Sequence, residues 1–167
     1  MKIIRWFDRH IEELLLTIFT SIMVTVIFVQ VVMRRLDNSL SWSEELARYC
    51  FIWLVYIGIS YGVKKQRHIK VDVLLVMLNQ KWKVILNILS TVLFIVFAIF
   101  VVYYGYEIAN KLLSFGQQSP ALHIPMGLVY MATPVGMGLT VIRLIQNLIT
   151  YFKVLLGKEV LEEQTEV

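Results

Sequence analysis

The sequence has few of the residues from which covalent frameworks and metal centres are built. Of its 167 residues, one is cysteine, three are histidine and three are proline. The single cysteine, Cys50, excludes an intrachain disulfide and a cysteine-ligated cluster, and we interpret it as a small apolar packing residue. The histidines, His10, His68 and His123, all lie outside the long apolar stretches. That placement argues against a haem held between helices by two histidines.

Charge is also scarce. Charged residues make up 17% of the chain and hydrophobic residues 58%, and the mean hydropathy is +0.70. Water-soluble domains are about 45–50% apolar, so an ordinary soluble globule is excluded. The high content of aromatic and β-branched residues excludes a disordered chain. No Asp, Glu, Lys or Arg stands in the middle of a long apolar stretch. Proton-coupled carriers place ionisable groups there, so a self-sufficient exporter of that kind is disfavoured.

Sequence motifs of common enzymes are missing. The chain has no phosphate-binding glycine loop, no His-x-x-x-His zinc pair and no Gly-x-Ser-x-Gly nucleophile turn. We therefore predict that the protein is not an enzyme and that it holds no cofactor or metal of its own.

What the chain does have is four apolar stretches long enough to cross a bilayer. About 20 helical residues at ~1.5 Å each cover a hydrocarbon core of ~30 Å. The stretches are residues 14–33, 46–63, 84–106 and 124–142. The first is longer than the apolar region of a signal peptide, about 7–15 residues, so we expect it to be retained. The sequence predicts an all-α integral membrane protein with four transmembrane helices.

The basic residues predict the orientation of these helices. Twelve of the 16 Lys and Arg residues lie on the side that would hold both termini, and four lie on the other side. Because basic residues concentrate on the cytoplasmic side of membrane proteins, we expect both termini to be cytoplasmic. This distribution accounts for the net charge of +4 without a nucleic-acid partner.

Two further segments are predicted to lie on the membrane surface as amphipathic helices. In residues 2–13, apolar residues recur at intervals of three and four, and charged residues including Glu12 and Glu13 fill the opposite face. In residues 69–82, the apolar part is only ten residues long and would reach ~15 Å as a helix, too short to cross. We expect one membrane domain over residues 1–157 and a solvated tail over 158–167.

Small and hydroxylated residues in the predicted spans are candidates for helix packing. Small residues four apart let helix backbones approach, and hydroxyls four apart suit hydrogen bonds between helices. A proline inside a span should kink it, because it removes a backbone donor. Packing of the bundle without further function is the simpler interpretation of these positions. They are Thr17, Ser21, Thr25, Gly58, Gly62, Ala132, Pro134 and Gly136.

The run before the second span carries the most distinctive charges. Ser41 and Glu44 have the spacing of a capping box, and Glu44 and Arg48 have that of a helical ion pair. One interpretation is a capped helix start at the membrane surface. The other is that these charges bind a protein partner on the outer face.

Four motifs occur together in one known family. They are residues 40–48 (LSWSEELAR), 67–72 (RHIKVD), 119–126 (SPALHIPM) and 134–136 (PVG). In this combination the chain resembles the DctQ-type small membrane subunit of TRAP transporters, the tripartite ATP-independent periplasmic carriers. The resemblance covers roughly residues 20 to 145, and His123 stands where a small residue is more usual.

The resemblance implies a non-catalytic scaffold subunit in the bacterial inner membrane. In that family a large membrane subunit binds the solute and sodium and moves them in an elevator-like motion. The small subunit steadies the fixed part of the complex. A soluble periplasmic binding protein delivers the solute, usually a carboxylate such as sialic acid or a C4-dicarboxylate. We therefore expect sodium in the large subunit and none in this chain.

Roles for individual residues follow from the resemblance. The residues at the outer end of the second span are expected to receive the large subunit or the binding protein, and those after this span to organise the cytoplasmic turn. For His68, structural hydrogen bonding is weighed against pH sensing. The two sets are Trp42, Glu44, Glu45 and Arg48, and Arg67, His68 and Asp72. Two other functions stay open, a membrane anchor of a redox enzyme and an independent small exporter.

Overall fold

The computed structural model describes residues 2–65 and 80–155, which fold into helices without a strand in those two ranges. In chain order the helices are α1 (Lys2–Arg35), α2 (Ser41–Lys64), α4 (Gln80–Ser114), α5 (Met126–Tyr130) and α6 (Ala132–Leu155). The predicted tail and all but the last three residues of the predicted surface helix over 69–82 lie outside the described residues. Residues 80–82 belong to the start of α4.

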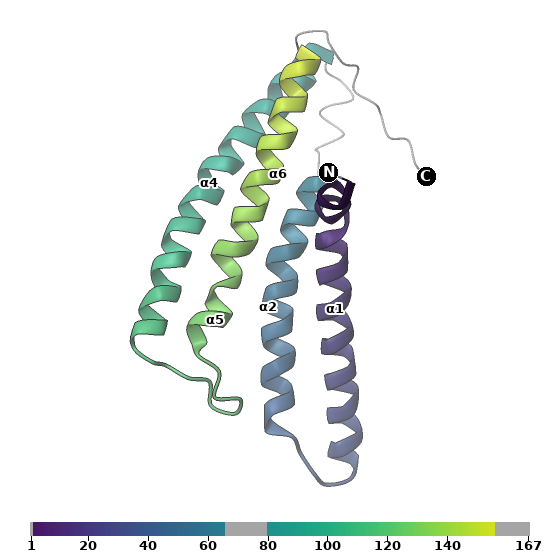
Figure 1. Ribbon diagram of the computed structural model, residues 1–167, viewed down its shortest axis with the longest axis vertical. Helices are drawn as coiled ribbons and strands as arrows, with labels where there is room; N and C mark the ends of the chain where they lie inside the picture. The colour runs from purple at the N-terminus through teal and green to yellow at the C-terminus, as the bar shows by residue number, and fades with distance from the viewer. Residues whose placement is uncertain (1, 66–79, 156–167) are drawn as a thin grey trace.

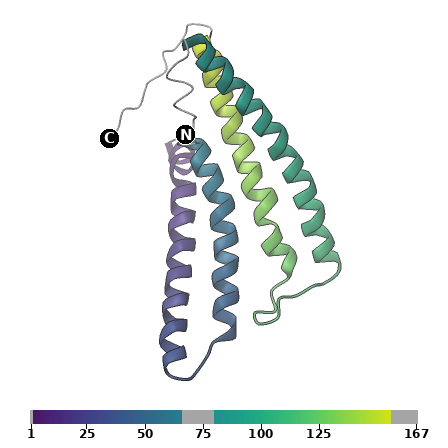
Figure 2. The ribbon, with the colours of Figure 1, turned by 180° about the vertical axis from the view of Figure 1, so that it is seen from behind.

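The long helices form two pairs joined through the middle. α1 packs along α2, α4 packs along α6, and α2 packs along α6, so α2 and α6 are central and α1 and α4 are outer (Figures 1 and 2). The connections over 36–40 and 115–125 lie together at one end, which we name the loop end (Figure 1). The opposite end, with the start of α1 and the ends of α2 and α6, is named the basic end.

Four helical segments are long and apolar enough to cross a membrane. They are His10–Arg35, Ser41–Lys64, Val84–Ser114 and Met126–Lys153. Each contains or overlaps one of the four stretches predicted from hydropathy, so the predicted all-α membrane architecture is confirmed. The helices are longer than the uncharged stretches, because helices continue through charged residues at their ends.

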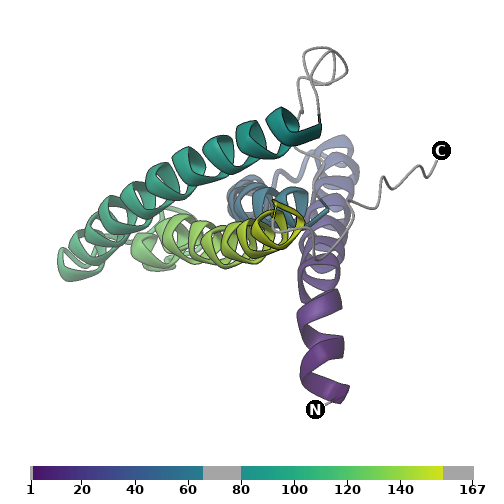
Figure 3. The same cartoon turned by 90° about the horizontal axis from the view of Figure 1, so that it is seen from above.

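The N-terminal segment is continuous with the first span rather than a separate helix. In Figure 1 the first turns of α1 are seen nearly end-on, and from above they extend away from the bundle (Figure 3). The start of α1 therefore runs across the long axis of the bundle. A helix that lies in a membrane interface has this orientation relative to the spans that follow it.

The outer helices expose broad apolar surfaces. In the most hydrophobic part of the first span, no residue is buried inside the molecule. In the corresponding part of the third span, 17% of the residues are buried. On α4 the exposed side chains include Phe97, Phe100 and Tyr103. A compact core of Val63, Ala98, Met137 and Leu144 joins α2, α4 and α6. In water such surfaces would aggregate, so their natural surroundings are lipid or another membrane protein.

The last span is interrupted near its proline. α5 ends at Tyr130, Met131 is a turn residue and α6 begins at Ala132. Pro134 has no backbone N–H to donate to the carbonyl of Tyr130, four residues earlier, so the helix is weakest in the turn before it. The interruption falls where the predicted kink would lie.

Candidate functional site

A carboxylate from α1 is buried among cations at the basic end. Glu12 is fully buried, and its two oxygens have different partners. Lys64 Nζ of α2 lies 2.6 Å from Oε2, and Arg143 Nε of α6 lies 2.7 Å from Oε1. The hydroxyl of Ser60 also donates to Oε1 at 3.1 Å. We name these four residues the Glu12 network.

The Glu12 network is shielded from water. The side chain of Arg143 is 7% exposed and that of Lys64 is 17% exposed. Arg143 also donates from Nη1 to the side-chain oxygen of Gln146 at 2.9 Å. A buried charge is tolerated when it is paired and hydrogen-bonded, and removing one member of a buried pair costs about 3–5 kcal/mol. The network therefore ties α1, α2 and α6 together strongly at one level.

Sequence reasoning missed this network. We predicted that Glu12 would belong to a water-facing polar face and that Arg143 would bound the fourth span. Instead Glu12 turns toward α2 and α6, and α6 continues twelve residues beyond Arg143, because that guanidinium is neutralised inside the protein. One signal was available in the sequence. An acidic residue, Glu12, and two basic residues, Lys64 and Arg143, stand at the predicted cytoplasmic ends of three different spans.

A second, more exposed pair lies beside the network. Glu13 accepts a hydrogen bond from the hydroxyl of Tyr61 at 3.1 Å and lies 3.5 Å from Lys65 Nζ. Its side chain is 39% exposed. Exposed ion pairs contribute about 0–1 kcal/mol to stability, so the Glu13 pair is expected to contribute little. The two adjacent glutamates thus each pair with a lysine, but Glu12 is buried and Glu13 is exposed.

At the loop end, Glu45 of α2 holds the connection between α4 and α5. Its Oε2 accepts hydrogen bonds from the backbone N–H groups of Ala121 and Leu122, each at 2.9 Å. Its Oε1 accepts the hydroxyl of Tyr49, which is also 3.4 Å from the sulfur of Met126. Glu45 thus acts as a backbone clamp within the chain.

The clamped connection is an ordered turn. Ser119 is almost completely buried, its N–H donates to the carbonyl of Ile124 at 2.9 Å, and its hydroxyl accepts from the N–H of Ile124 at 3.2 Å. A backbone bridge joins Gln118 and Pro125. His123 has a φ of +53°, in the left-handed region that glycine and asparagine adopt most easily. Glycine at this position would fit that backbone without strain, because it has no Cβ.

The other residues predicted to act at the outer end of the second span lie at the surface of the protein. Glu44 is exposed and accepts a hydrogen bond from the amide of Gln30 on α1 at 2.7 Å, and Trp42 is 39% exposed. Arg48 is exposed as well. The predicted capping box is wrong, because the N-cap residue is Leu40, whose side chain makes no cap hydrogen bond, and the hydroxyl that bonds there is that of Ser43, which donates to the Leu40 carbonyl at 2.7 Å. Glu45 therefore separates from Trp42, Glu44 and Arg48, which remain available to a partner.

The predicted residues after the second span fall outside the described part of the chain. They are Arg67, His68 and Asp72. Their roles in the turn stay predictions.

The predicted packing residues divide by helix. On α1, the hydroxyls of Thr17 and Thr25 donate to carbonyls of their own helix, at 2.8 and 2.7 Å, and both side chains are exposed, as is Ser21. The expected hydrogen bonds between helices therefore do not form at Thr17 and Thr25 within this chain. Backbone carbonyls of the same helix are nearer acceptors for threonine than a neighbouring helix is.

The two pairs of small residues also differ. A Cβ built on Gly58 would be 3.9 Å from Leu16, and one on Gly62 would meet no described atom within 4 Å. A Cβ on Gly136 would fall 2.5 Å from the Cβ of Tyr56 on α2. Ala132 is fully buried. The helices α2 and α6 therefore approach closely at Gly136 of α6, and no such close approach to a described residue occurs at Gly58 and Gly62 of α2.

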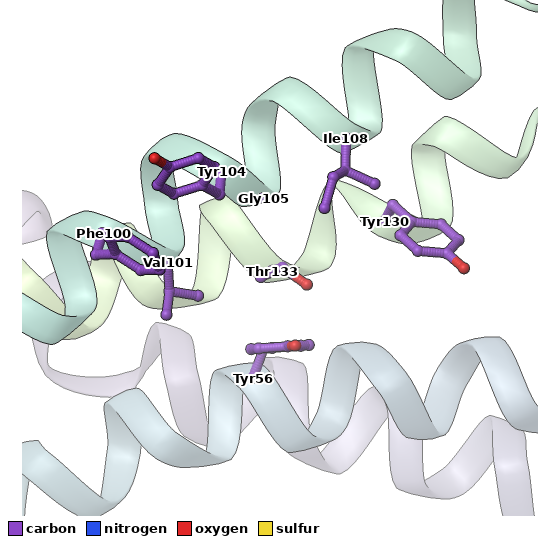
Figure 4. A pocket seen from close by; sticks show the side chains of 8 residues that line it. All are labelled: Tyr56, Phe100, Val101, Tyr104, Gly105, Ile108, Tyr130 and Thr133. Atoms are coloured by element: carbon purple, nitrogen blue, oxygen red, sulfur yellow. The ribbon is translucent and has the colours of Figure 1, made fainter.

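An apolar pocket opens between α2, α4 and the α5–α6 junction. It encloses about 300 Å³ and is lined by Tyr56, Phe100, Val101, Tyr104, Gly105, Ile108, Tyr130 and Thr133 (Figure 4). No group of three potential metal ligands among His, Cys, Asp and Glu occurs within the residues described here. The pocket offers packing space for apolar groups and no charged side chain.

The sequence matches a family over residues 23–154, most of the chain, and that family is described as "Tripartite ATP-independent periplasmic transporters, DctQ component". The chain belongs to the DctQ family. This family is a transporter component and not an enzyme. The predicted family resemblance is thereby confirmed, and the chain is a small permease component of the TRAP type.

Known relatives of this DctQ chain include separate subunits and longer proteins. It is 29% identical to a putative TRAP transporter small permease protein of Haemophilus influenzae, over 79% of each chain. It is 28% identical to the sialic acid TRAP transporter small permease protein SiaQ of Vibrio cholerae, over 94% of this chain and 90% of that protein.

One relative is much longer than this chain. The isethionate TRAP transporter permease protein DctMQ of Oleidesulfovibrio alaskensis is 29% identical over 87% of this chain, and the match spans only 24% of that protein. In that relative, a segment like this chain is part of one polypeptide with a larger remainder.

Proposed function

We propose that this DctQ chain is the non-catalytic scaffold subunit of a sodium-driven importer in the bacterial inner membrane. Its partner is a large permease that holds the solute and sodium sites and moves them in an elevator-like motion. The observation that carries the proposal is the relation to DctMQ, in which a segment like this one accounts for 24% of one permease polypeptide. A separate chain of this family then supplies the same part of the complex as its own subunit.

The structure of the spans supports a scaffold role. Among the described residues, the ion pairs of Glu12 and Glu13 link helices of this chain to one another, and a further pair, Lys111 with Glu107, lies within α4. The long outer helices expose apolar side chains along their length, which lipid or another membrane protein must cover. A protein that steadies a moving partner needs a fixed fold and an apolar surface, and it needs no solute site of its own.

We further propose that the solute is a small organic anion delivered by a periplasmic binding protein. The names of the relatives give C4-dicarboxylates, sialic acid and isethionate as their solutes. All three carry a carboxylate or a sulfonate. Trp42, Glu44 and Arg48, exposed at the loop end, are candidates to contact the binding protein or the outer face of the large permease.

Uptake in cells tests this proposal. A strain that lacks this chain but keeps its large permease should lose sodium-dependent uptake of one radiolabelled anion among the three, and the intact chain should restore it. A charge-reversed variant, Glu44→Lys with Arg48→Glu, should lower uptake without changing the amount of protein in the membrane. Equal uptake with and without the chain would refute the scaffold role.

A further inference from the structure

We propose that Glu12 is the positioning residue that holds α1, α2 and α6 as one rigid unit at the basic end of the bundle. The inference rests on the proposed function, because rigidity matters most in a subunit against which another one moves. No motif of the sequence pointed to Glu12. It follows from the burial of the carboxylate and from the two other helices, α2 and α6, that supply its contacts.

The geometry makes Glu12 the direct link between an outer helix and the far central helix. α1 and α6 each pack along α2, and α1 reaches α6 through the 2.7 Å contact of Glu12 with Arg143. The opposite oxygen of the same carboxylate is used by Lys64 of α2 at 2.6 Å. Because both oxygens are engaged by different helices, the carboxylate fixes the rotation of α1 as well as its distance.

An apolar cluster of similar volume would hold the helices together equally well. Replacing buried ion networks by packed apolar residues is often neutral or stabilising. Apolar contacts are not directional, however, so they permit small rotations and shifts that a carboxylate with directed hydrogen bonds does not. We therefore assign the Glu12 network to alignment of the helices, with stability as a secondary effect.

The neighbouring residue supplies a matched control. Glu12→Gln and Glu13→Gln remove the same charge from adjacent positions of one helix, one fully buried and one 39% exposed at its side chain. Glu12→Gln removes the negative charge beside the buried Arg143 and the partly buried Lys64, and it should lower the melting temperature of the purified complex by roughly 10 °C. Glu13→Gln should change it by no more than about 4 °C.

Spin-label distances measure the alignment itself. In a Cys50→Ala background, labels are placed at Ile18→Cys on α1 and Ile149→Cys on α6, two exposed positions. The complex with the large permease is then measured by double electron–electron resonance. We expect a narrow distance distribution in the parent and in Glu13→Gln, and a broad one in Glu12→Gln.

A triple apolar variant separates alignment from stability. Glu12→Met, Lys64→Met and Arg143→Met together should restore the melting temperature, while the distance distribution stays as broad as in Glu12→Gln and uptake is lower than with the parent chain. A narrow distribution or normal uptake in this variant would overturn the inference. If uptake never depends on the chain, the proposed function fails instead, and the distances still decide whether Glu12 aligns the helices.

Discussion

Gly136 marks a close approach of the two central helices, so substitution there should separate them. A Cβ at this position would lie 2.5 Å from the Cβ of Tyr56 and 2.9 Å from both its carbonyl carbon and its carbonyl oxygen. Carbon atoms pack best at about 3.5–4.0 Å, so the two backbones must move apart by about 1 Å to admit a methyl group. Two of the three atoms belong to backbone, which cannot turn aside as a long side chain can.

The expected size follows from two opposing effects. Overpacking of this kind costs about 1–3 kcal/mol. Alanine in place of glycine favours the helix by up to about 1 kcal/mol, which offsets part of that cost. Gly136→Ala should therefore destabilise the protein by roughly 1–2 kcal/mol, a fall of about 2–8 °C in melting temperature for a chain of this size.

Gly138 is the matched control, two residues further along α6. A Cβ there would meet no described atom within 4 Å apart from its own helix backbone. Gly138→Ala should therefore raise the melting temperature slightly, through helix propensity alone. Both variants are compared by thermal unfolding in the same detergent. Equal melting temperatures for the two variants would refute the assignment of the α2–α6 contact.

Three further outcomes are expected. Glu45→Ala removes the acceptor of two backbone N–H groups, which should cost about 1–3 kcal/mol of stability. Amide hydrogen exchange in residues 119–125 should therefore accelerate. Unchanged exchange would show that Glu45 is not needed to hold this turn. Glu44→Gln, at the exposed neighbouring position, should leave that exchange rate as it is. His123→Gly removes a side chain from a residue at positive φ, so the melting temperature should hold or rise by about 2–4 °C, while His123→Val should lower it, and the reverse order would contradict the turn geometry.

Hydropathy predicted the four spans because crossing a bilayer depends mainly on length and composition. The helix ends could not be predicted in the same way. The hydropathy scan ended the fourth span before Arg143, yet Arg143 lies within α6, since Glu12 from the other part of the chain neutralises it. Pairing between residues 131 positions apart is a property of the fold, and local patterns do not contain it.

The spacing of small residues predicted which residues share a helix face, but it did not predict which helix that face contacts. Gly58 and Gly62 have the same spacing as Ala132 and Gly136, yet the close approach occurs at Gly136. A spacing of four places residues on one face, and the packing of the other helices decides whether that face meets a backbone. Glu45 shows the same limit, because the sequence singled it out while only the structure shows that it clamps the turn over 119–125.

Reconstitution of purified proteins into vesicles tests the central claim most directly. The large permease is reconstituted with and without this chain, beside this chain alone, and accumulation of the transported anion is followed under an imposed sodium gradient with the binding protein present. We predict accumulation only in vesicles that contain both membrane proteins. Accumulation by this chain alone, or equal accumulation by the large permease without it, would contradict the account.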